Sequence, residues 1–159
     1  MVPIQKPGRS KQDYQTPLEF LIAVRSKLWI TDFAIDLAAS AQNSVVSGCY
    51  YDEAVDSLKQ TWQFGSWCWL NPPYADIRPW VEKAAHESAL GARIAMLVPA
   101  SVGANWWKDY VVNSSYQLFL NGRLTFAGCT TPYPKDCALL LYTPFIRSGN
   151  AVWEWRKDA

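Results

Sequence analysis

Apolar side chains recur with two different periods along the chain, and each change of period marks the boundary of a predicted element. Residues 17–28 have apolar positions at helical spacing, with Thr16 as the expected N-cap and Pro17 in the first turn. The same spacing returns over residues 77–90, where Gly91 is the expected stop, and over the shorter segment 105–114. The pattern therefore predicts three helices that are separated by other elements.

Short apolar runs between these helices are typical of strands. One run begins at residue 32 and ends near Asp36, a weaker one covers 44–51, and a third covers 66–71. Residues 92–100 and 137–145 are apolar runs that suit buried strands, and 116–126 predicts two strands across an Asn-Gly turn. Residues 52–62 are either helical or irregular. Alternating strands and helices predict an α/β domain with a mostly parallel sheet and antiparallel final strands.

The segment Asn-Pro-Pro-Tyr at residues 71–74 interrupts this pattern directly after an apolar run. Two consecutive prolines fix φ and remove two backbone donors, so neither a helix interior nor a central strand continues through them. The strand must end at Asn71. A rigid loop follows that presents an amide side chain, unclaimed carbonyls and the ring of Tyr74.

Length and composition limit the class of protein. The 159 residues fit one domain over residues 13–159, preceded by a flexible basic arm over residues 1–12 with Lys6, Arg9 and Lys11. No apolar run reaches the roughly 20 residues of a membrane span, and the start of the chain has no apolar signal core, so we expect a cytoplasmic protein. The net charge of +1 neither requires nor excludes nucleic acid, and most of the nine tryptophans are expected in the core.

The cysteines and the single histidine argue against a metal centre. Cys49, Cys68, Cys129 and Cys137 include no CxxC pair and are expected to be free buried thiols. His86 lies on a predicted helix and is expected at its surface. We therefore expect no bound metal.

The proline loop has the groups that an exocyclic amine on a planar base would need. In open α/β sheets, ligands bind beyond the carboxyl ends of strands, where Asp36 and Asn71 are both expected. An Asn oxygen and the Pro72 carbonyl can accept the two amine hydrogens and raise the electron density on nitrogen. Pro73 adds stiffness, and the Tyr74 ring offers a stacking face for a base that has left its helix. No histidine base is required.

Asn-Pro-Pro-Tyr resembles the catalytic motif of amino-group methyltransferases, especially those that act on DNA adenine. Other segments occur in the order and spacing of one branch, the phage- and prophage-type DNA adenine-N6 methyltransferases, over residues 13–143. They are DYQTP, FAIDLAAS, DSL, WLNPPY followed by PW, LVPAS followed by NWW, and GRLTF. The resemblance implies a compact Rossmann-like fold, S-adenosylmethionine as cofactor, DNA as partner, and a phage or prophage gene product in the bacterial cytoplasm.

The resemblance also assigns roles to single residues. Asn71 and Pro72 would hold the target amine, Tyr74 would stack on the base, and Pro73 would stiffen the loop. Asp36 would hold the methionine amino group of the cofactor, as a carboxylate suits an ammonium. The remaining assigned cofactor residues are Ala38, Ala39 and Ser40 in the adjoining turn, Asp56 at the adenine, and Gln15, Thr16 and Pro17 at the methionine end.

Four further residues are candidates for contact with nucleic acid. Of the adjacent Trp106 and Trp107, we expect one in the core and one lining a DNA channel. Lys108 and Arg123 are candidate phosphate contacts, although Arg123 can equally be solvated. Asp36 alone can be a cofactor ligand or a helix cap, and Asp56 alone can be a capping carboxylate.

The chain departs from the family that it resembles in two respects. The turn that begins at Asp36, Asp-Leu-Ala-Ala-Ser, contains no glycine, and no separate target-recognition domain is visible. Sequence specificity is therefore either low or carried by residues 101–109 and 121–136 or by a dimer; the sequence does not predict the oligomeric state. Two other functions remain open: methylation of an RNA base or a protein glutamine, and a Trp-rich nucleic-acid-binding module without catalysis.

Overall fold

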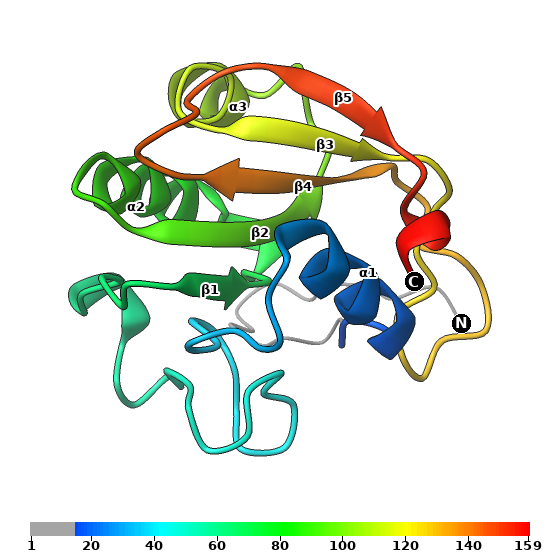
Figure 1. Ribbon diagram of the computed structural model, residues 1–159, viewed down its shortest axis with the longest axis horizontal. Coiled ribbons are helices and arrows are strands. Elements are labelled where there is room, and N and C mark those ends of the chain that lie inside the picture. The colour runs from blue at the N-terminus through cyan, green and yellow to red at the C-terminus, as the bar shows by residue number, and fades with distance from the viewer. Residues whose placement is uncertain (1–14) are drawn as a thin grey trace.

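A five-stranded sheet with the order β1-β2-β4-β3-β5 organises residues 15–159, the part of the chain that the computed structural model describes (Figure 1). The sheet is mixed. β1 is parallel to β2, β4 is antiparallel to both β2 and β3, and β5 is parallel to β3. The strands are β1 Trp67–Leu70, β2 Arg93–Pro99, β3 Tyr116–Leu120, β4 Cys137–Tyr142 and β5 Asn150–Trp153.

These pairings confirm the predicted α/β class and correct its final part. β4 alone of the five strands runs against the others, so the sheet is mostly parallel in direction. The predicted antiparallel pairing of the final strands is confirmed for β3 with β4, and a further strand that was not predicted, β5, is parallel to β3. β5 forms because Trp153 is anchored in the core, while Val152 on its other face stays exposed.

The two strands predicted before β1 are present only as isolated bridges of Asp36 with Tyr50 and with Trp69. Backbone bonds still place the segment at Asp36 beside β1, since the amide of Ala34 donates to the carbonyl of Trp67 at 2.8 Å. Full strands do not form because local polar contacts compete with the sheet ladder. The Ser44 hydroxyl both donates to the carbonyl and accepts from the amide of Val46.

Three α-helices confirm the predicted helices, but the start of the first is corrected, and the third ends at Tyr110 rather than at residue 114. They are α1 Leu18–Leu28, α2 Arg78–Ala89 and α3 Asn105–Tyr110. Thr16 is not the N-cap of α1: Pro17 occupies that position, without a side-chain capping bond, and Thr16 binds elsewhere. Short 3-10 turns are η1 Ser57–Lys59, inside the segment expected to be helical or irregular, η2 Tyr74–Asp76 and η3 Trp155–Asp158.

The hairpin predicted over residues 116–126 is wrong in its second half. β3 ends at Leu120, and residues 121–126 form no strand. Leu124 and Phe126 instead point into the core with about 1% of their surface exposed. The Tyr133 amide donates to the Leu124 carbonyl at 2.7 Å, which ties the following loop to this segment. Long-range burial thus overrides the local Asn-Gly turn signal.

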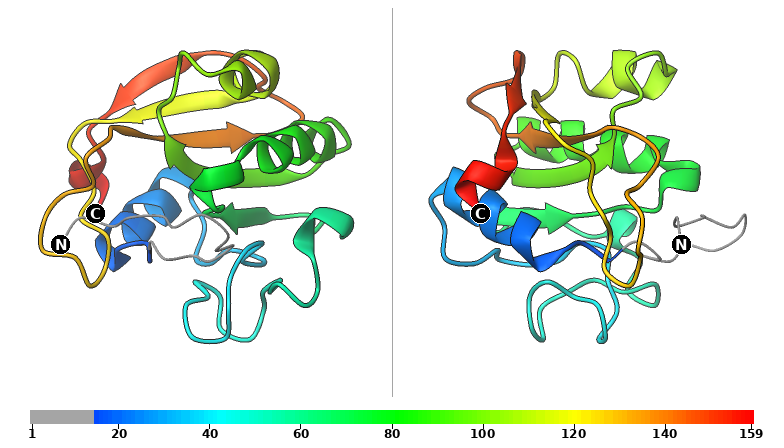
Figure 2. Two further views of the ribbon diagram at one scale, coloured as in Figure 1. Left: turned by 180° about the vertical axis from the view of Figure 1, so that it is seen from behind. Right: turned by 90° about the vertical axis from the view of Figure 1, so that its right-hand side faces the viewer.

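Helices cover both faces of the sheet (Figure 2). Strand side chains alternate between two apolar clusters, as on β2, where Ala95 and Leu97 join one cluster and Ile94 and Met96 join the other. The first cluster contains residues of α1 and η3, and the second contains residues of α2 and α3. Burial on both faces explains why the central strands are continuous apolar runs.

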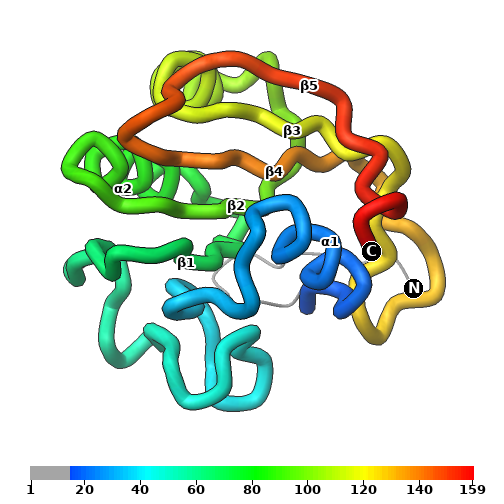
Figure 3. Tube along the Cα trace, in the orientation of Figure 1, coloured from blue at the N-terminus to red at the C-terminus, as the bar shows by residue number. Residues whose placement is uncertain are grey.

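The chain between α1 and β1 forms long turns beyond the β1 edge of the sheet (Figure 3). No helix within residues 15–159 is long and apolar enough to cross a bilayer. All four cysteines are free, as expected, and Cys68 and Cys137 are buried, whereas Cys49 and Cys129 are partly exposed. The basic arm over residues 1–12 lies outside the described residues.

Candidate active site

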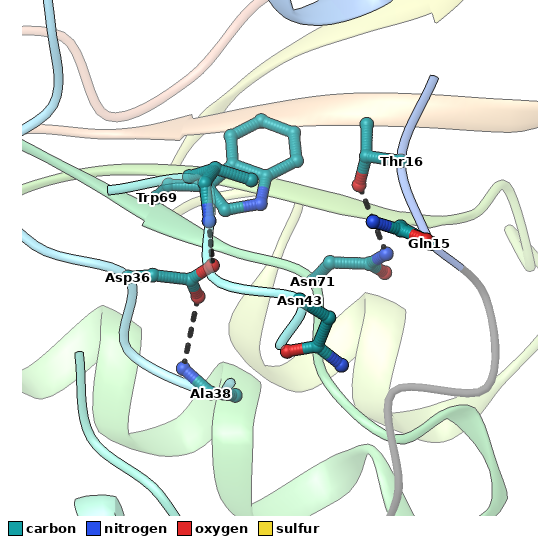
Figure 4. A pocket seen from close by; sticks show the side chains of 8 residues that line it. Gln15, Thr16, Asp36, Ala38, Asn43, Trp69 and Asn71 are labelled. Carbon is teal, nitrogen blue, oxygen red and sulfur yellow. Dashed lines mark hydrogen bonds between the residues drawn. The ribbon is translucent and has the colours of Figure 1, made fainter. Parts of the chain in front are cut away.

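A pocket opens where the Asp36 segment and β1 both end (Figure 4). It encloses about 230 Å³ of empty space, counting the part that is open to solvent. Both carboxyl ends meet here because the two segments run parallel, as the Asp36–Trp69 bridge requires. The lining residues are Gln15, Thr16, Asp36, Ala38, Asn43, Val45, Trp69 and Asn71.

Asp36 is a buried carboxylate with 3% of its surface exposed. Its Oδ1 accepts a hydrogen bond from the Ala38 amide at 3.2 Å, and Oδ2 accepts one from the Val45 amide at 2.9 Å. Burial raises the pKa of Asp36 from 3.8 to about 7, although these two amides act in the opposite direction. Within residues 15–159 no cationic side chain forms an ion pair with Asp36. A ligand with a positive charge would supply the missing partner.

The turn after Asp36 is built without glycine. Asn43 stabilises this turn in place of a glycine. Its side-chain Oδ1 accepts a hydrogen bond from the backbone amide of Ser40 at 2.7 Å, and its backbone amide donates one to the Ser40 carbonyl at 3.3 Å. The Ala39 amide donates to the carbonyl of Tyr51 at 3.0 Å. Ala38 thereby reaches the pocket wall, and its small side chain leaves room for a ligand. The departure noted in the sequence is compatible with a formed pocket.

Asn71 directly follows β1 and is 5% exposed. Its amide nitrogen donates to Oγ1 of Thr16 at 3.2 Å, and its Oδ1 accepts from the Tyr74 hydroxyl at 2.7 Å. Pro72 and Pro73 are buried, and Pro73 caps η2 in an extended conformation. No hydrogen bond to the Pro72 carbonyl is formed from residues 15–159. The loop therefore holds an amide oxygen and a backbone carbonyl as acceptors next to each other.

Tyr74 packs against an aromatic residue that the sequence analysis missed. Its ring meets the edge of Tyr133 at 6.2 Å between centroids, and Tyr133 in turn contacts Phe126 at 5.4 Å. Tyr133 is 5% exposed. It comes from the Pro-Tyr-Pro segment after β3. The only sequence feature that could have indicated its role is an aromatic residue between two prolines. Tyr74 is thus held by its hydroxyl at Asn71 and by its ring at Tyr133.

Other missed residues line the pocket itself. Trp69 lies two positions before Asn71 and therefore on the same face of the strand. The period of two along a strand would have predicted its position in the pocket lining. Asn43 and Val45 come from the loop after Asp36. Asn43 was detectable only as an Asn that follows a run of small residues.

The N-terminal segment brings Gln15 and Thr16 to the pocket, while Pro17 is not among its lining residues. The Gln15 carbonyl accepts a hydrogen bond from the Ala127 amide at 3.0 Å. The Pro17 carbonyl accepts hydrogen bonds from the backbone amides of Phe20 and Leu21 in the first turn of α1. Residues before α1 and after β3 therefore meet beside the pocket.

Asp56 lies outside the pocket lining. It is the N-cap residue of η1 and forms an exposed ion pair with Lys59 at 3.6 Å. Its assignment to the cofactor's adenine stays a prediction.

The candidate nucleic-acid residues lie on α3 and after β3. Trp107 is 5% exposed and stacks on Phe119 at 6.1 Å, so one member of the pair lies in the core as expected. Trp106 is partly exposed, and its contact with DNA stays a prediction. Lys108 forms an ion pair with Asp109 at 3.5 Å, and Arg123 forms one with Asp136 at 3.1 Å. The expected surface position of His86 is confirmed. Among residues 15–159 there is no cluster of His, Cys, Asp and Glu that could hold a metal.

Comparison with known proteins adds a family to this geometry. The family model described as DNA N-6-adenine-methyltransferase (Dam) matches residues 5–142. A protein named DNA N-6-adenine-methyltransferase from Escherichia phage T1 is 28% identical over 119 residues, 75% of this chain and 49% of that protein. One of the same name from Haemophilus phage HP1 is 29% identical over 106 residues, 65% of this chain and 60% of that protein. The chain thus spans about half to three-fifths of these relatives.

Proposed function

The chain belongs to the DNA N-6-adenine-methyltransferase (Dam) family, and on this premise we propose that it transfers a methyl group from S-adenosylmethionine to the N6 amine of adenine in DNA. The observation that carries the proposal is the position of Asn71. Its side chain is held by hydrogen bonds to Thr16 and Tyr74, next to the Pro72 carbonyl, in a pocket that is also lined by the buried Asp36. A methyl donor and a planar amine need these two neighbouring sites.

The donor set of the pocket fits S-adenosylmethionine. Asp36 is the residue we assign to the ammonium group. Its carboxylate is buried and has no cationic partner among residues 15–159, so a positive charge would stabilise it. Gln15, Thr16 and Ala38 would line the methionine end, with Ala39 and Ser40 in the turn behind it. When bound, the cofactor supplies an electrophilic methyl group. Asp56 is proposed to contact the adenine moiety, and Pro17 to fix the entry of α1.

The proline loop would activate the target amine by accepting its hydrogens. An amide oxygen can accept two hydrogen bonds, so Asn71 Oδ1 can accept one N6 hydrogen in addition to the Tyr74 hydroxyl. The Pro72 carbonyl would accept the other hydrogen. Both contacts increase the electron density on nitrogen and aim its lone pair toward the methyl group. The rigid prolines keep the two acceptors in place before the base arrives.

Tyr74 would hold the base by its ring. A base inside a duplex cannot reach Asn71, so the target adenine has to leave the helix, and stacking compensates for part of that cost. The partly exposed Trp106 and the cations Lys108 and Arg123 are proposed to contact the DNA outside the pocket. Replacing Arg123 with Ala is expected to lower the salt dependence of DNA binding by about one phosphate contact. An unchanged salt slope would remove Arg123 from the interface.

The finer fold assignment is a Rossmann-like methyltransferase domain over residues 13–159. It is supported by helices on both sheet faces and by the carboxyl-end position of the pocket. We propose that target specificity comes from residues 101–109 and 121–136. The phage origin of the relatives supports action in the cytoplasm of a bacterial host.

The decisive experiment is methylation of mixed-sequence DNA by purified protein with labelled S-adenosylmethionine, followed by mass spectrometry of the nucleosides. We expect N6-methyladenine from the intact protein and on the order of 100-fold less from Asn71→Ala. RNA and a protein pool are treated in parallel, because a planar amide or an RNA amine would fit the same loop. Label in either of these pools alone would replace DNA as the substrate. Tight DNA binding without any cofactor binding would overturn the enzymatic proposal.

A further inference from the structure

The amide of Asn71 is held between two hydroxyl groups that come from different parts of the chain. Thr16 lies 3.2 Å from the amide nitrogen, and the Tyr74 hydroxyl lies 2.7 Å from the amide oxygen. Hydroxyls can donate or accept, so the distances decide the orientation. A separation of 2.7 Å is typical of O–H···O bonds, and 3.2 Å is within the range of N–H···O bonds. The amide nitrogen therefore faces Thr16.

This orientation matters for an amine substrate. With the nitrogen toward Thr16, the amide oxygen is left on the side of Tyr74 and can accept a hydrogen from the substrate. If the amide turned over, its NH₂ group would face an amine that also donates, and two donors would oppose each other. A group that favours one of the two orientations thus affects the reaction without touching the substrate.

Thr16 is placed to do this by a segment that is fixed on both sides. Pro17, the next residue, caps α1, so the backbone at Thr16 is fixed by the start of that helix. On the other side, the Gln15 carbonyl accepts the Ala127 amide at 3.0 Å. Thr16 itself is only 9% exposed, and its hydroxyl accepts from Asn71, while Pro17 is the N-cap residue of α1. Its hydroxyl is therefore available to Asn71 rather than to the helix.

We propose that Thr16 is a positioning residue that fixes the side-chain orientation of Asn71, so that the amide oxygen faces the target amine. The inference rests on the proposed function of the loop and differs from the cofactor contact that family resemblance implies for Thr16. The two roles predict different kinetics. A positioning residue controls kcat, whereas a residue that only binds the methyl donor controls its KM and affinity.

The test compares three variants of the full chain in the DNA methylation assay. Thr16→Val preserves shape but removes the acceptor, Thr16→Ser restores it, and Thr31→Val is an exposed control with the same change. We expect Thr16→Val to lower kcat about ten-fold, a larger effect than any change in cofactor affinity measured by calorimetry. Thr16→Ser should recover most of the loss, and Thr31→Val should match the unmodified protein.

Normal kcat in Thr16→Val, or weakened cofactor binding as its main effect, would overturn the proposal. A double-mutant cycle covers the case in which Thr16→Val is poorly folded. Adding Thr16→Ala to Asn71→Ala should cause no further loss in residual activity if Thr16 acts through Asn71, and a further loss would contradict this. If the unmodified protein methylates no DNA, the proposed function itself fails, which is a separate outcome.

Discussion

The phenol hydroxyl of Tyr74 donates a hydrogen bond of 2.7 Å to Oδ1 of Asn71, three residues earlier in the same loop. Tyr74 therefore contributes a polar contact as well as a ring. Replacing it with Phe keeps the ring and removes the hydroxyl, so we expect kcat to fall about three- to ten-fold, the worth of one hydrogen bond. Tyr74→Leu removes both and should lose more, mainly through weaker base binding. Equal activity of all three proteins would exclude both roles.

Asn71 itself should be far more sensitive than its partners. Asn71→Ala removes the acceptor that is aimed at the target amine, and we expect a loss in methylation rate on the order of 100-fold or more, as for other preorganised polar groups. Cofactor affinity should change little, because Asp36 remains in place. The measurement is single-turnover methylation with saturating cofactor, with circular dichroism as the folding control. An active Asn71→Ala protein would remove the loop from the mechanism.

Asp36 should make the stability and the cofactor affinity depend on pH in opposite directions. Its pKa is raised from 3.8 to about 7, so between these pH values the folded protein keeps a proton that the unfolded chain has lost. The stabilising contribution is complete below about pH 3.8 and is lost as pH rises through 7. Three pKa units set an upper bound of about 4 kcal/mol on the loss. The ionised form binds an ammonium, so cofactor affinity should rise over the same range.

Asp36→Asn provides the comparison for both measurements. Asn has one acceptor oxygen for the two backbone amides of Ala38 and Val45, so the variant carries a constant penalty at all pH values. The difference in unfolding free energy between the two proteins, from urea titrations at several pH values, should therefore change between about pH 3.8 and 7, where folded and unfolded Asp36 differ in protonation. A difference that stays flat from pH 4 to 8 would show that the buried carboxylate does not titrate as described.

The sequence was sufficient for elements whose burial is uniform and insufficient where distant contacts decide. β2 and β4 are buried on both faces, so their apolar runs were clear strand signals. β5 has an exposed Val152 and depends on pairing with β3, far earlier in the chain. The segment after Asn121 was predicted as a strand because Asn-Gly is a local hairpin signal, yet Leu124 turns into the core.

The same distinction holds for the site. Asp36 and Asn71 were identified because both follow apolar runs, and parallel strands bring their ends together. Tyr133 was missed because its contact with Tyr74 joins two loops, and no period relates them. Asn43 stabilises its turn by a side-chain bond that a propensity reading does not show.

Tyr133 should influence catalysis through Tyr74. Its buried ring meets Tyr74 edge to face, and such pairs contribute about 0.5–1.5 kcal/mol. We expect Tyr133→Leu to weaken binding of the flipped base about two- to ten-fold, while Tyr133→Phe stays close to the original protein. Fluorescence of 2-aminopurine at the target position reports the extruded base directly. Equal signals from the Leu and Phe variants would show that the aromatic contact has no part in holding the base.

Trp106 and Trp107 should separate DNA binding from stability. Trp107 is 5% exposed and stacked on Phe119, so Trp107→Ala is expected to lower the unfolding free energy by about 3–5 kcal/mol. Trp106 is partly exposed, and Trp106→Ala should cost less than about 2 kcal/mol. If Trp106 contacts DNA, the same variant should weaken DNA binding about ten-fold, as expected for the loss of one stacked base. Urea unfolding and DNA titration measure the two effects separately, and an unchanged DNA affinity in Trp106→Ala would assign both tryptophans to the fold alone.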